Sequence, residues 1–358
     1  MGLSQTMTRR GLLSALPALA AAPSIRLPQR IRVAILGLDG HTGEIVRPLP
    51  QLPDVEVVAI SDATPGAVEK FGKGNTRLTA ARRYTDYRRM LEQEKLDVVA
   101  VCNNNGERAQ AILDCVDRNL HVIAEKPLAL TREDLERIRR AVQQRRVGLG
   151  MLLPMRYDPQ FQALKQLVDS GELGEIAQIS AQKSYKAGQR PEWMRKRATY
   201  GGTIPWIGIH MVDLMRFTSG REFTHAASFA GHVGQPEIGD MENTTGTVFR
   251  MDNGGVATLH MDYYRPETAP THGDDRLRLA GTKGVAEYMA ATGVTVISAN
   301  AKPRVVTELP PQGSVFVDFL EHVYNKKAPT LTLADIYRNN EIVIGAQEAA
   351  ERNQIVRL

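Results

Sequence analysis

The sequence predicts an α/β protein in two parts: a parallel sheet wrapped by helices over residues 31–150, and an α+β part with a large, mostly antiparallel sheet over residues 151–358. Two observations support this prediction. In the first part, short β-branched apolar runs alternate with helix-like stretches, which is typical of parallel strands joined by right-handed crossovers. In the second part, several runs alternate between apolar and polar residues, as half-buried strands do.

Composition allows two domains and excludes some functions. The chain has 358 residues, which is enough for two hydrophobic cores. No segment approaches the roughly 20 apolar residues of a membrane span. The net charge of +5 has no basic cluster behind it, so nucleic-acid binding is not indicated. No group of Cys and His residues has the spacing of metal ligands, so we expect no metal site.

Residues 1–30 differ from the rest and are expected to be an export signal and linker. Arg9 and Arg10 precede an apolar run that ends in small residues at Ala22. This pattern resembles a twin-arginine signal, which would place the protein in the periplasm without a membrane anchor. Cleavage after Ala22 would leave 43 basic and 40 acidic residues, a charge of +3. The alternative is a basic N-terminus without a signal, and a cytoplasmic protein.

The first strand, Arg32 to Leu36, leads into a glycine-rich turn. Glycines let a backbone approach a pyrophosphate, and the following helix N-terminus favours an anion. The spacing G-x-x-G-x-x-G departs from the usual G-x-G-x-x-G, so a plain glycine turn stays open. The candidate cofactor-binding residues of this turn are Gly37, Gly40, His41, Thr42 and Gly43.

The second strand ends at Asp62, 19 residues after Gly43. An acidic residue there accepts hydrogen bonds from a ribose 2′-hydroxyl and repels a 2′-phosphate. The sequence therefore favours NAD over NADP, with an ordinary turn aspartate as the alternative.

The strand from Asp97 to Cys102 is followed by Asn103, Asn104 and Asn105. These asparagines are expected to line the nicotinamide side of a cofactor site, or else to form an ordinary strand-to-helix turn. Cys102 and the helical Cys115 are expected to be buried free thiols rather than a disulfide.

The next strand, beginning at His121, ends in Glu125, Lys126 and Pro127. Proline closes the strand because it has no amide to donate to a ladder. Lys126 is thereby placed at the carboxyl edge of the sheet, where ligands of open α/β sheets bind.

The order of RVAILG, VVAISD, DVVAVCNNN and HVIAEKPLAL resembles the Gfo/Idh/MocA oxidoreductase family. The resemblance implies a Rossmann NAD(P)-binding domain joined to a sugar-binding α/β domain. It also implies that Lys126 contacts the nicotinamide ribose and the substrate hydroxyl, with Glu125 beside it at the cofactor.

Residues 201–213 (GGTIPWIGIHMVD) resemble the family's glycine-rich lead into a helix. His210 matches the histidine that hydrogen-bonds the reacting hydroxyl, and Asp213 matches an acidic residue one turn later. Trp206 stands where sugar dehydrogenases of the family carry an aspartate. His210 is therefore the predicted acid/base and Lys126 its electrostatic partner, while Trp206 either stacks on a sugar ring or packs in the core.

Residues 186–200 are expected to form a loop over the site, and one face of the second sheet is expected to pack on helices while the other faces the cofactor. Residues 252–255 predict a hairpin, and residues 315–323 and 334–352 predict packing helices. Weaker candidates for substrate contact, any of which could equally be structural, are Arg156, Arg190, Trp193, Tyr200, Trp206 and Asp213, with Arg197 and His272 weaker still.

The leading interpretation is an NAD(P)-dependent oxidoreductase acting on a sugar, sugar derivative or cyclitol, with a tightly held cofactor. A redox-neutral NAD-dependent glycoside hydrolase and a non-catalytic ligand-binding protein are the alternatives. We expect a small carbohydrate-like ligand and a homo-oligomer, either a dimer or a tetramer.

Overall fold

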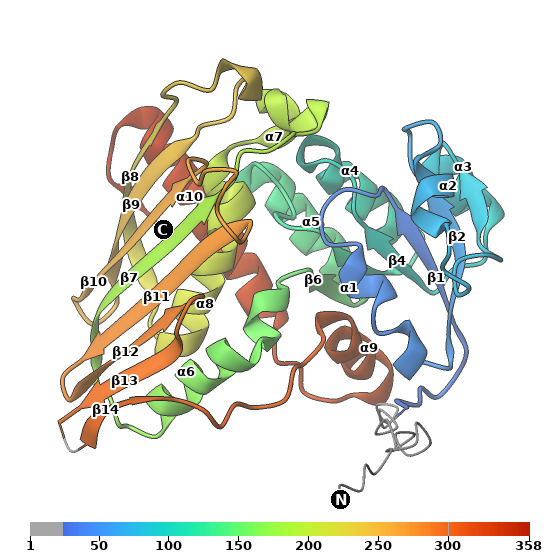
Figure 1. The fold of residues 1–358 in the computed structure, drawn as a ribbon. Coiled ribbons are helices and arrows are strands. Elements are labelled where there is room, and N and C mark those ends of the chain that lie inside the picture. The colour runs from blue at the N-terminus through green and yellow to red at the C-terminus, as the bar shows by residue number, and fades with distance from the viewer. Residues whose placement is uncertain (1–23, 300) are drawn as a thin grey trace, which may run out of the picture.

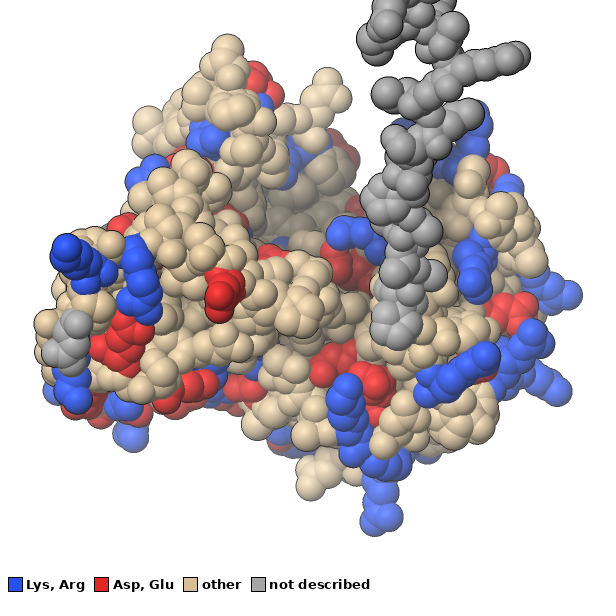
Figure 2. All heavy atoms as spheres, turned by 60° about the horizontal axis from the view of Figure 1, so that its bottom comes forward, with Lys and Arg blue, Asp and Glu red and all other residues tan. Residues whose placement is uncertain are grey.

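A computed structural model describes residues 24–299 and 301–358. The chain forms two lobes, each built on one sheet (Figure 1). The twin-arginine sequence lies outside the described residues. Within them, no helix is long and apolar enough to cross a membrane. On the face in Figure 2, basic and acidic side chains are interspersed.

The N-terminal sheet is parallel and has the strand order β3-β2-β1-β4-β5-β6, which confirms the Rossmann prediction. Its buried strands are apolar on both faces because helices cover both sides. The strands are β1 (Ile31–Leu36), β2 (Val55–Ser61), β3 (Arg82–Tyr84), β4 (Val98–Val101), β5 (His121–Ala124) and β6 (Leu149–Met151). The helices are α1 (Gly43–Val46), α2 (Ala67–Gly72), α3 (Tyr87–Gln93), α4 (Asn105–Val116) and α5 (Arg132–Arg145).

The second sheet has the order β14-β13-β12-β11-β7-β10-β9-β8-β15 and is antiparallel except between β7 and β10. The predicted hairpin joins β9 and β10. The strands are β7 (Ile176–Tyr185), β8 (Phe223–Gly231), β9 (Thr244–Met251), β10 (Val256–Asp262), β11 (Gly273–Gly281), β12 (Gly284–Met289), β13 (Gly293–Ser298), β14 (Ala301–Val305) and β15 (Val356–Arg357). The helices are α6 (Pro159–Asp169), α7 (Arg197–Tyr200), α8 (Ile209–Ser219), α9 (Val315–Asn325) and α10 (Leu333–Arg352).

The faces of this sheet differ from the prediction. Helices α6, α8 and α10 lie between the sheet and the N-terminal lobe (Figure 1). Ile179, Ala181 and Lys183 point to that same side and are buried. Because helices and site residues share one face, the opposite face stays open. Phe229 and Val248 on that face are 71% and 49% exposed.

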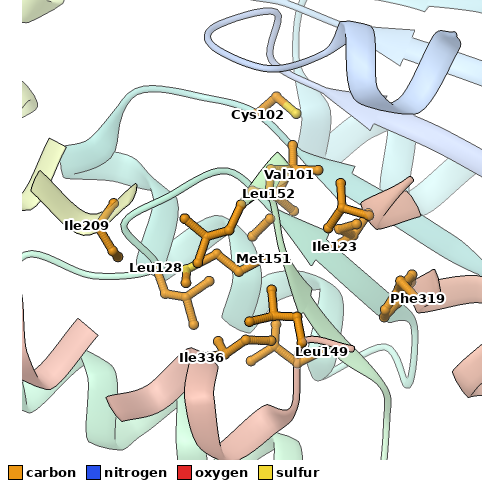
Figure 3. Close-up of a cluster of buried hydrophobic side chains, with 14 of the residues drawn as sticks. Val101, Cys102, Ile123, Leu128, Leu149, Met151, Leu152, Ile209, Phe319 and Ile336 are labelled. Atoms are coloured by element: carbon orange, nitrogen blue, oxygen red, sulfur yellow. The ribbon is translucent and has the colours of Figure 1, made fainter. Parts of the chain in front are cut away.

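One apolar cluster joins the two lobes beneath the end of β5 (Figure 3). Leu128 follows the Glu-Lys-Pro segment, and Ile209 precedes His210 on α8. Phe319 of α9 and Ile336 of α10 reach the same cluster from the C-terminal helices. This packing fixes the end of β5 against the start of α8. Cys102 and Cys115 are buried free thiols, as predicted.

Candidate active site

The glycine-rich turn requires its first two glycines. Gly37 and Gly40 have φ of +76° and +74°, in the left-handed region that favours glycine. A Cβ on Gly37 would lie 2.6 Å from the backbone of Asn103, and one on Gly40 would lie 2.1 Å from Oε1 of Glu125. The turn is therefore pressed against the ends of β4 and β5, with no room for side chains.

A cleft of about 1070 Å³ runs along the carboxyl edge of the N-terminal sheet. Its walls include Gly37, Asp62 and Asn103 from that lobe and Trp193 from the other. The Asp62 carboxylate accepts the backbone N–H groups of Leu38 and Thr64 at 2.9 and 2.8 Å, which holds it at the strand tip. The carboxylate oxygens keep further lone pairs, which could accept hydrogen bonds from a ligand.

The three asparagines have different roles. Asn103 lines the cleft, and its buried Oδ1 has no hydrogen-bond partner among the described residues. Asn104 lines the cleft too, but its side chain caps α4 by accepting the N–H of Glu107 at 3.1 Å. Asn105 is buried and donates to the carbonyl of Tyr200 at 2.7 Å. Asn105 therefore ties the two lobes together and does not line the cofactor side, contrary to expectation.

Glu125 is completely buried and serves the glycine-rich turn. Its Oε1 accepts the backbone N–H of His41 at 2.6 Å and contacts His41 Nδ1, and its Oε2 accepts the N–H of Lys126 at 2.5 Å. Burial opposes its ionisation, but the charges of His41, Lys126 and Arg108 outweigh burial and lower the pKa of Glu125 to about 2. It is a fixed carboxylate under the turn.

Lys126 extends from the same segment toward the second lobe. Its Nζ donates to the carbonyl of Trp206 at 2.7 Å and lies 3.4 Å from the centre of the indole ring. Burial and the positive charges of Arg108 and Lys183, against the pull of Glu125, lower the pKa of Lys126 to about 7. Beneath it, Arg108 donates to the carbonyls of Lys126 and Pro127 at 3.1 and 2.9 Å.

His210 begins α8, directly after a π-helical turn at Ile204–Gly208 that carries Trp206. The side chain is 5% exposed, and its Nδ1 has no hydrogen-bond partner among the described residues. It is not bonded to Asp213. Burial, with the nearby charges of Lys126, His41 and Lys183, holds the pKa of His210 well below its usual value. The imidazole is therefore neutral and able to accept a proton.

The His41 ring meets the His210 ring edge-on. The ring centroids are 5.2 Å apart and the ring planes are at 72°. The glycine-rich turn of one lobe and the α8 histidine of the other are thereby in direct contact. Lys126 directly follows Glu125, which binds the glycine-rich turn. The predicted pair Lys126 and His210 therefore converges beside the turn.

A buried lysine that the sequence reading did not select lies close by. Lys183 on β7 donates to Asp275 Oδ2 at 2.7 Å and to the hydroxyl of Tyr185 at 2.8 Å. Burial opposes its charge, but Tyr185 and Asp275 outweigh burial and raise the pKa of Lys183. One signal could have found it: Lys183 falls in phase with the apolar residues Ile179 and Ala181 of its strand.

Trp193 covers the site from the loop at 186–200. Its Nε1–H donates to Asp39 Oδ1 in the glycine-rich turn at 2.8 Å, and its ring meets that of Trp206 edge-on at 5.3 Å. Burial, partly offset by the Trp193 hydrogen bond, raises the pKa of Asp39. The loop therefore closes onto the turn, and Trp206 packs between Lys126 and Trp193.

Three of the weaker candidates for substrate contact have partners inside the second lobe. Arg156 and Asp213, 2% and 1% exposed, pair with each other, and Arg156 also pairs with Asp335 at 3.0 Å. Tyr200 is fully buried, with its hydroxyl 2.9 Å from that of Thr203. These groups satisfy one another inside the second lobe.

The remaining weak candidates lie at the rim. Arg190 is half-buried, with its guanidinium 4.7 Å from the centre of the Tyr263 ring. Arg197 is bound to Glu242 and to the carbonyl of Gly201. His272 lies 5.0 Å from the Tyr185 ring, and burial, with the charges of Arg190 and Lys186, lowers its pKa.

Comparison with known proteins gives two family matches. The model described as "Oxidoreductase family, NAD-binding Rossmann fold" matches residues 31–152, and the one described as "GFO/IDH/MocA C-terminal domain" matches residues 161–287. Together they cover more than half of the chain.

Individual relatives agree. The chain is 23% identical to the scyllo-inositol 2-dehydrogenase (NAD(+)) of Bacillus subtilis over 93% of this chain and 97% of that protein. A solved Thermotoga maritima protein, provisionally described as an oxidoreductase, is 33% identical with a TM-score of 0.87 over 92% of this chain and 100% of its own. A levoglucosan dehydrogenase in complex with NADH shares the fold at 18% identity, with a TM-score of 0.79 over 92% and 99%.

Proposed function

Because the chain belongs to the GFO/IDH/MocA family of NAD-binding oxidoreductases, we propose that it transfers a hydride between a nicotinamide cofactor and a hydroxyl carbon of a sugar, sugar derivative or cyclitol. One observation supports this most strongly. Lys126 and His210, from different lobes, converge at the glycine-rich turn, where His210 contacts His41. A proton acceptor and a cation would thereby stand together beside the turn that is proposed to bind the cofactor.

The residues of the first lobe fit a dinucleotide. Gly37 and Gly40 have no side chains, Asp62 stands at the tip of β2, and the buried Oδ1 of Asn103 has no hydrogen-bond partner among residues 24–299 and 301–358. These residues would hold the pyrophosphate, a ribose and the nicotinamide side, respectively. The bound nicotinamide would supply the hydride acceptor or donor.

The residues beside the glycine-rich turn would bind the substrate hydroxyl and move its proton. Neutral His210 removes the hydroxyl proton as the carbinol loses its hydride. Lys126 lies under Trp206 and stabilises negative charge that develops on the same oxygen. Trp193 and its loop exclude water from the site. Because position 206 holds tryptophan instead of an acidic residue, this position has no carboxylate that could compete with His210 for the proton.

The cofactor is proposed to be NAD rather than NADP. The support is the Asp62 carboxylate, held at the strand tip by two backbone N–H groups, which would repel a 2′-phosphate. The purified protein is expected to bind NAD at least tenfold more tightly than NADP, about 1.4 kcal/mol, in a fluorescence titration. Equal affinities would remove this role for Asp62.

A sugar or cyclitol substrate is supported by the names of similar proteins, a scyllo-inositol 2-dehydrogenase and a levoglucosan dehydrogenase. We also propose export with a tightly held cofactor, on the sequence of residues 8–22, and self-association through the open face of the second sheet, where Phe229 is exposed. Cell fractionation and light scattering test these two points.

The central experiment begins with purified protein. It is denatured, and the released nucleotide is identified by mass spectrometry. Protein loaded again with NAD is then incubated with cyclitols, aldoses and anhydrosugars, and the absorbance of NADH is followed. Bound or binding NAD with net reduction supports the proposal. A protein that neither carries nor binds a dinucleotide would be a ligand-binding protein, and the proposal would fail.

A second candidate is a redox-neutral glycoside hydrolase. The observation that favours it is Trp206, which replaces the acidic residue of the dehydrogenases with an aromatic platform beside Lys126. Aryl glycosides test it directly. Aglycone release without net NADH would establish the hydrolase and exclude the net dehydrogenase.

A further inference from the structure

The imidazole of His210 is almost completely enclosed, and its Nδ1 side is closed to solvent. The ring is 5% exposed, and its Nδ1 is buried without a partner among the described residues. The cations Lys126 and Lys183 lie nearby, and both disfavour a protonated His210. A proton taken from substrate would therefore leave His210 charged in a poorly solvated, positive environment, which is costly.

The group in contact with His210 has the opposite surroundings. The His41 side chain is 32% exposed, whereas the Glu125 side chain behind it is 0% exposed. Nδ1 of His41 contacts Glu125 Oε1, and the His41 backbone N–H donates to that same oxygen at 2.6 Å. A carboxylate bound to one ring nitrogen fixes the orientation of an imidazole and stabilises its protonated form. The other nitrogen, Nε2, is left for exchange.

We propose that His41, oriented by Glu125, forms a proton relay that carries the proton of His210 to solvent. The inference rests on the proposed function, in which His210 accepts the hydroxyl proton. The substrate O–H bond breaks and its proton binds His210, while the hydride leaves with two electrons for the cofactor. His210 then passes its proton to His41, and His41 releases it to water. The substrate is left as a carbonyl, and His210 returns to its neutral form.

The two rings are close enough for a proton to pass between them through one water molecule. The ring centroids of His41 and His210 are 5.2 Å apart in an edge-on arrangement, which brings ring atoms of one histidine to the face of the other. Gly40 has no Cβ, so the Glu125 carboxylate can reach the His41 backbone. The charged groups around the pair are Glu125, Arg108, Lys126 and Lys183, and a protonated His41 would itself disfavour a protonated His210. Among these only Glu125 favours a protonated histidine.

The test uses His41→Ala and His41→Phe in the full-length protein, with His322→Ala on the exposed side of α9 as the control. With saturating NAD and substrate, His41→Ala is expected to lower kcat by about 100-fold, a typical contribution of positioned acid–base transfer. Imidazole added to the buffer is expected to restore much of kcat in His41→Ala but not in His41→Phe, whose ring fills the space. A solvent deuterium isotope effect on kcat should grow in His41→Ala.

A readout without turnover uses the cofactor-free protein. Exchange of the His210 ring N–H with water, followed by ¹⁵N NMR, is expected to slow about tenfold or more in His41→Phe, because its proton exit is removed. NAD affinity is measured alongside, so that a binding defect is recognised.

The outcomes separate the two proposals. An active wild type together with unchanged kcat in His41→Ala, or lost kcat that imidazole does not restore, would overturn the relay and leave the oxidoreductase standing. A wild type without hydride transfer to or from any hydroxyl compound tested would overturn both.

Discussion

Replacing Glu125 by glutamine tests whether the negative charge of this side chain stabilises the folded protein at the glycine-rich turn. In the folded protein the pKa of Glu125 is about 2, against 4.5 for an unperturbed glutamate. At about 1.4 kcal/mol per pKa unit, the fixed charge contributes about 3 kcal/mol to the free energy of unfolding at pH 7. Glutamine removes this charge and turns an amide donor toward one of two backbone N–H groups, His41 or Lys126, so the loss is not recovered.

The pH dependence has a definite sign. Because the pKa of Glu125 is lower in the folded state, its stabilisation is complete above about pH 4.5 and is lost as the pH falls toward 2. The wild type and Glu125→Gln should therefore differ by about 3 kcal/mol at pH 7, and by progressively less from pH 4.5 downward. For a chain of this size, with about 2.1 cal/mol/K of unfolding entropy per residue, the difference corresponds to a Tm lower by roughly 4 °C.

Urea unfolding followed by tryptophan fluorescence is a suitable assay, because the two tryptophans of the chain, Trp193 and Trp206, both lie at the site. Glu308→Gln, at an exposed position in the segment between β14 and α9, is the matched control and should leave the midpoint unchanged. Equal midpoints for Glu125→Gln and wild type at pH 7, or a gap that stays constant down to pH 3, would refute the reasoning.

Three further substitutions test other contacts. Gly40→Ala, whose Cβ would lie 2.1 Å from Glu125 Oε1 at φ +74°, is expected to weaken NAD binding by at least about tenfold in a titration; affinity within twofold of wild type would contradict this. Arg156→Met leaves Asp213 buried without its cation and should cost about 3–5 kcal/mol in urea unfolding; a loss under 1 kcal/mol would show that the pair is dispensable. Trp193→Phe removes the hydrogen bond to Asp39 and should raise KM about fivefold, worth about 1 kcal/mol; an unchanged KM would show that the loop closes without it.

Local patterns were sufficient to predict most of the fold. The apolar runs of the first lobe and the alternating runs of the second became strands, and the turn at 252–255 became the β9–β10 hairpin. The exposed face of the second sheet was assigned wrongly because alternation shows that a strand has two faces without showing what covers each. Only the placement of α6, α8 and α10 decides that.

The site was predictable where residues stand at element ends. Lys126 lies at the carboxyl edge of the first sheet because it follows β5, and the apolar cluster around Leu128 and Ile209 holds the start of α8, with His210, against that edge. The partners from distant positions were not predictable. Lys183 pairs with Asp275, 92 positions away, and Glu125 reaches His41, 84 positions away. For Arg156 and Asp213 the sequence left both a structural and a ligand-binding role open, because a buried ion pair and a ligand contact use the same residue types.

The adjacent residues Glu125 and Lys126 contact different lobes: Glu125 binds the glycine-rich turn, and Lys126 contacts Trp206. The Glu125 carboxylate is committed to the turn through His41, so it is not free to accept the ammonium of Lys126. Lys126 instead contacts the carbonyl and the ring of Trp206, which attract a cation but do not take up a proton. An acidic side chain at position 206 would pair with Lys126 and raise its pKa, and could itself take the proton. With tryptophan there, acid–base chemistry is left to the histidines. The two that touch come one from each lobe, so the packing of the lobes against each other completes the proposed catalytic arrangement.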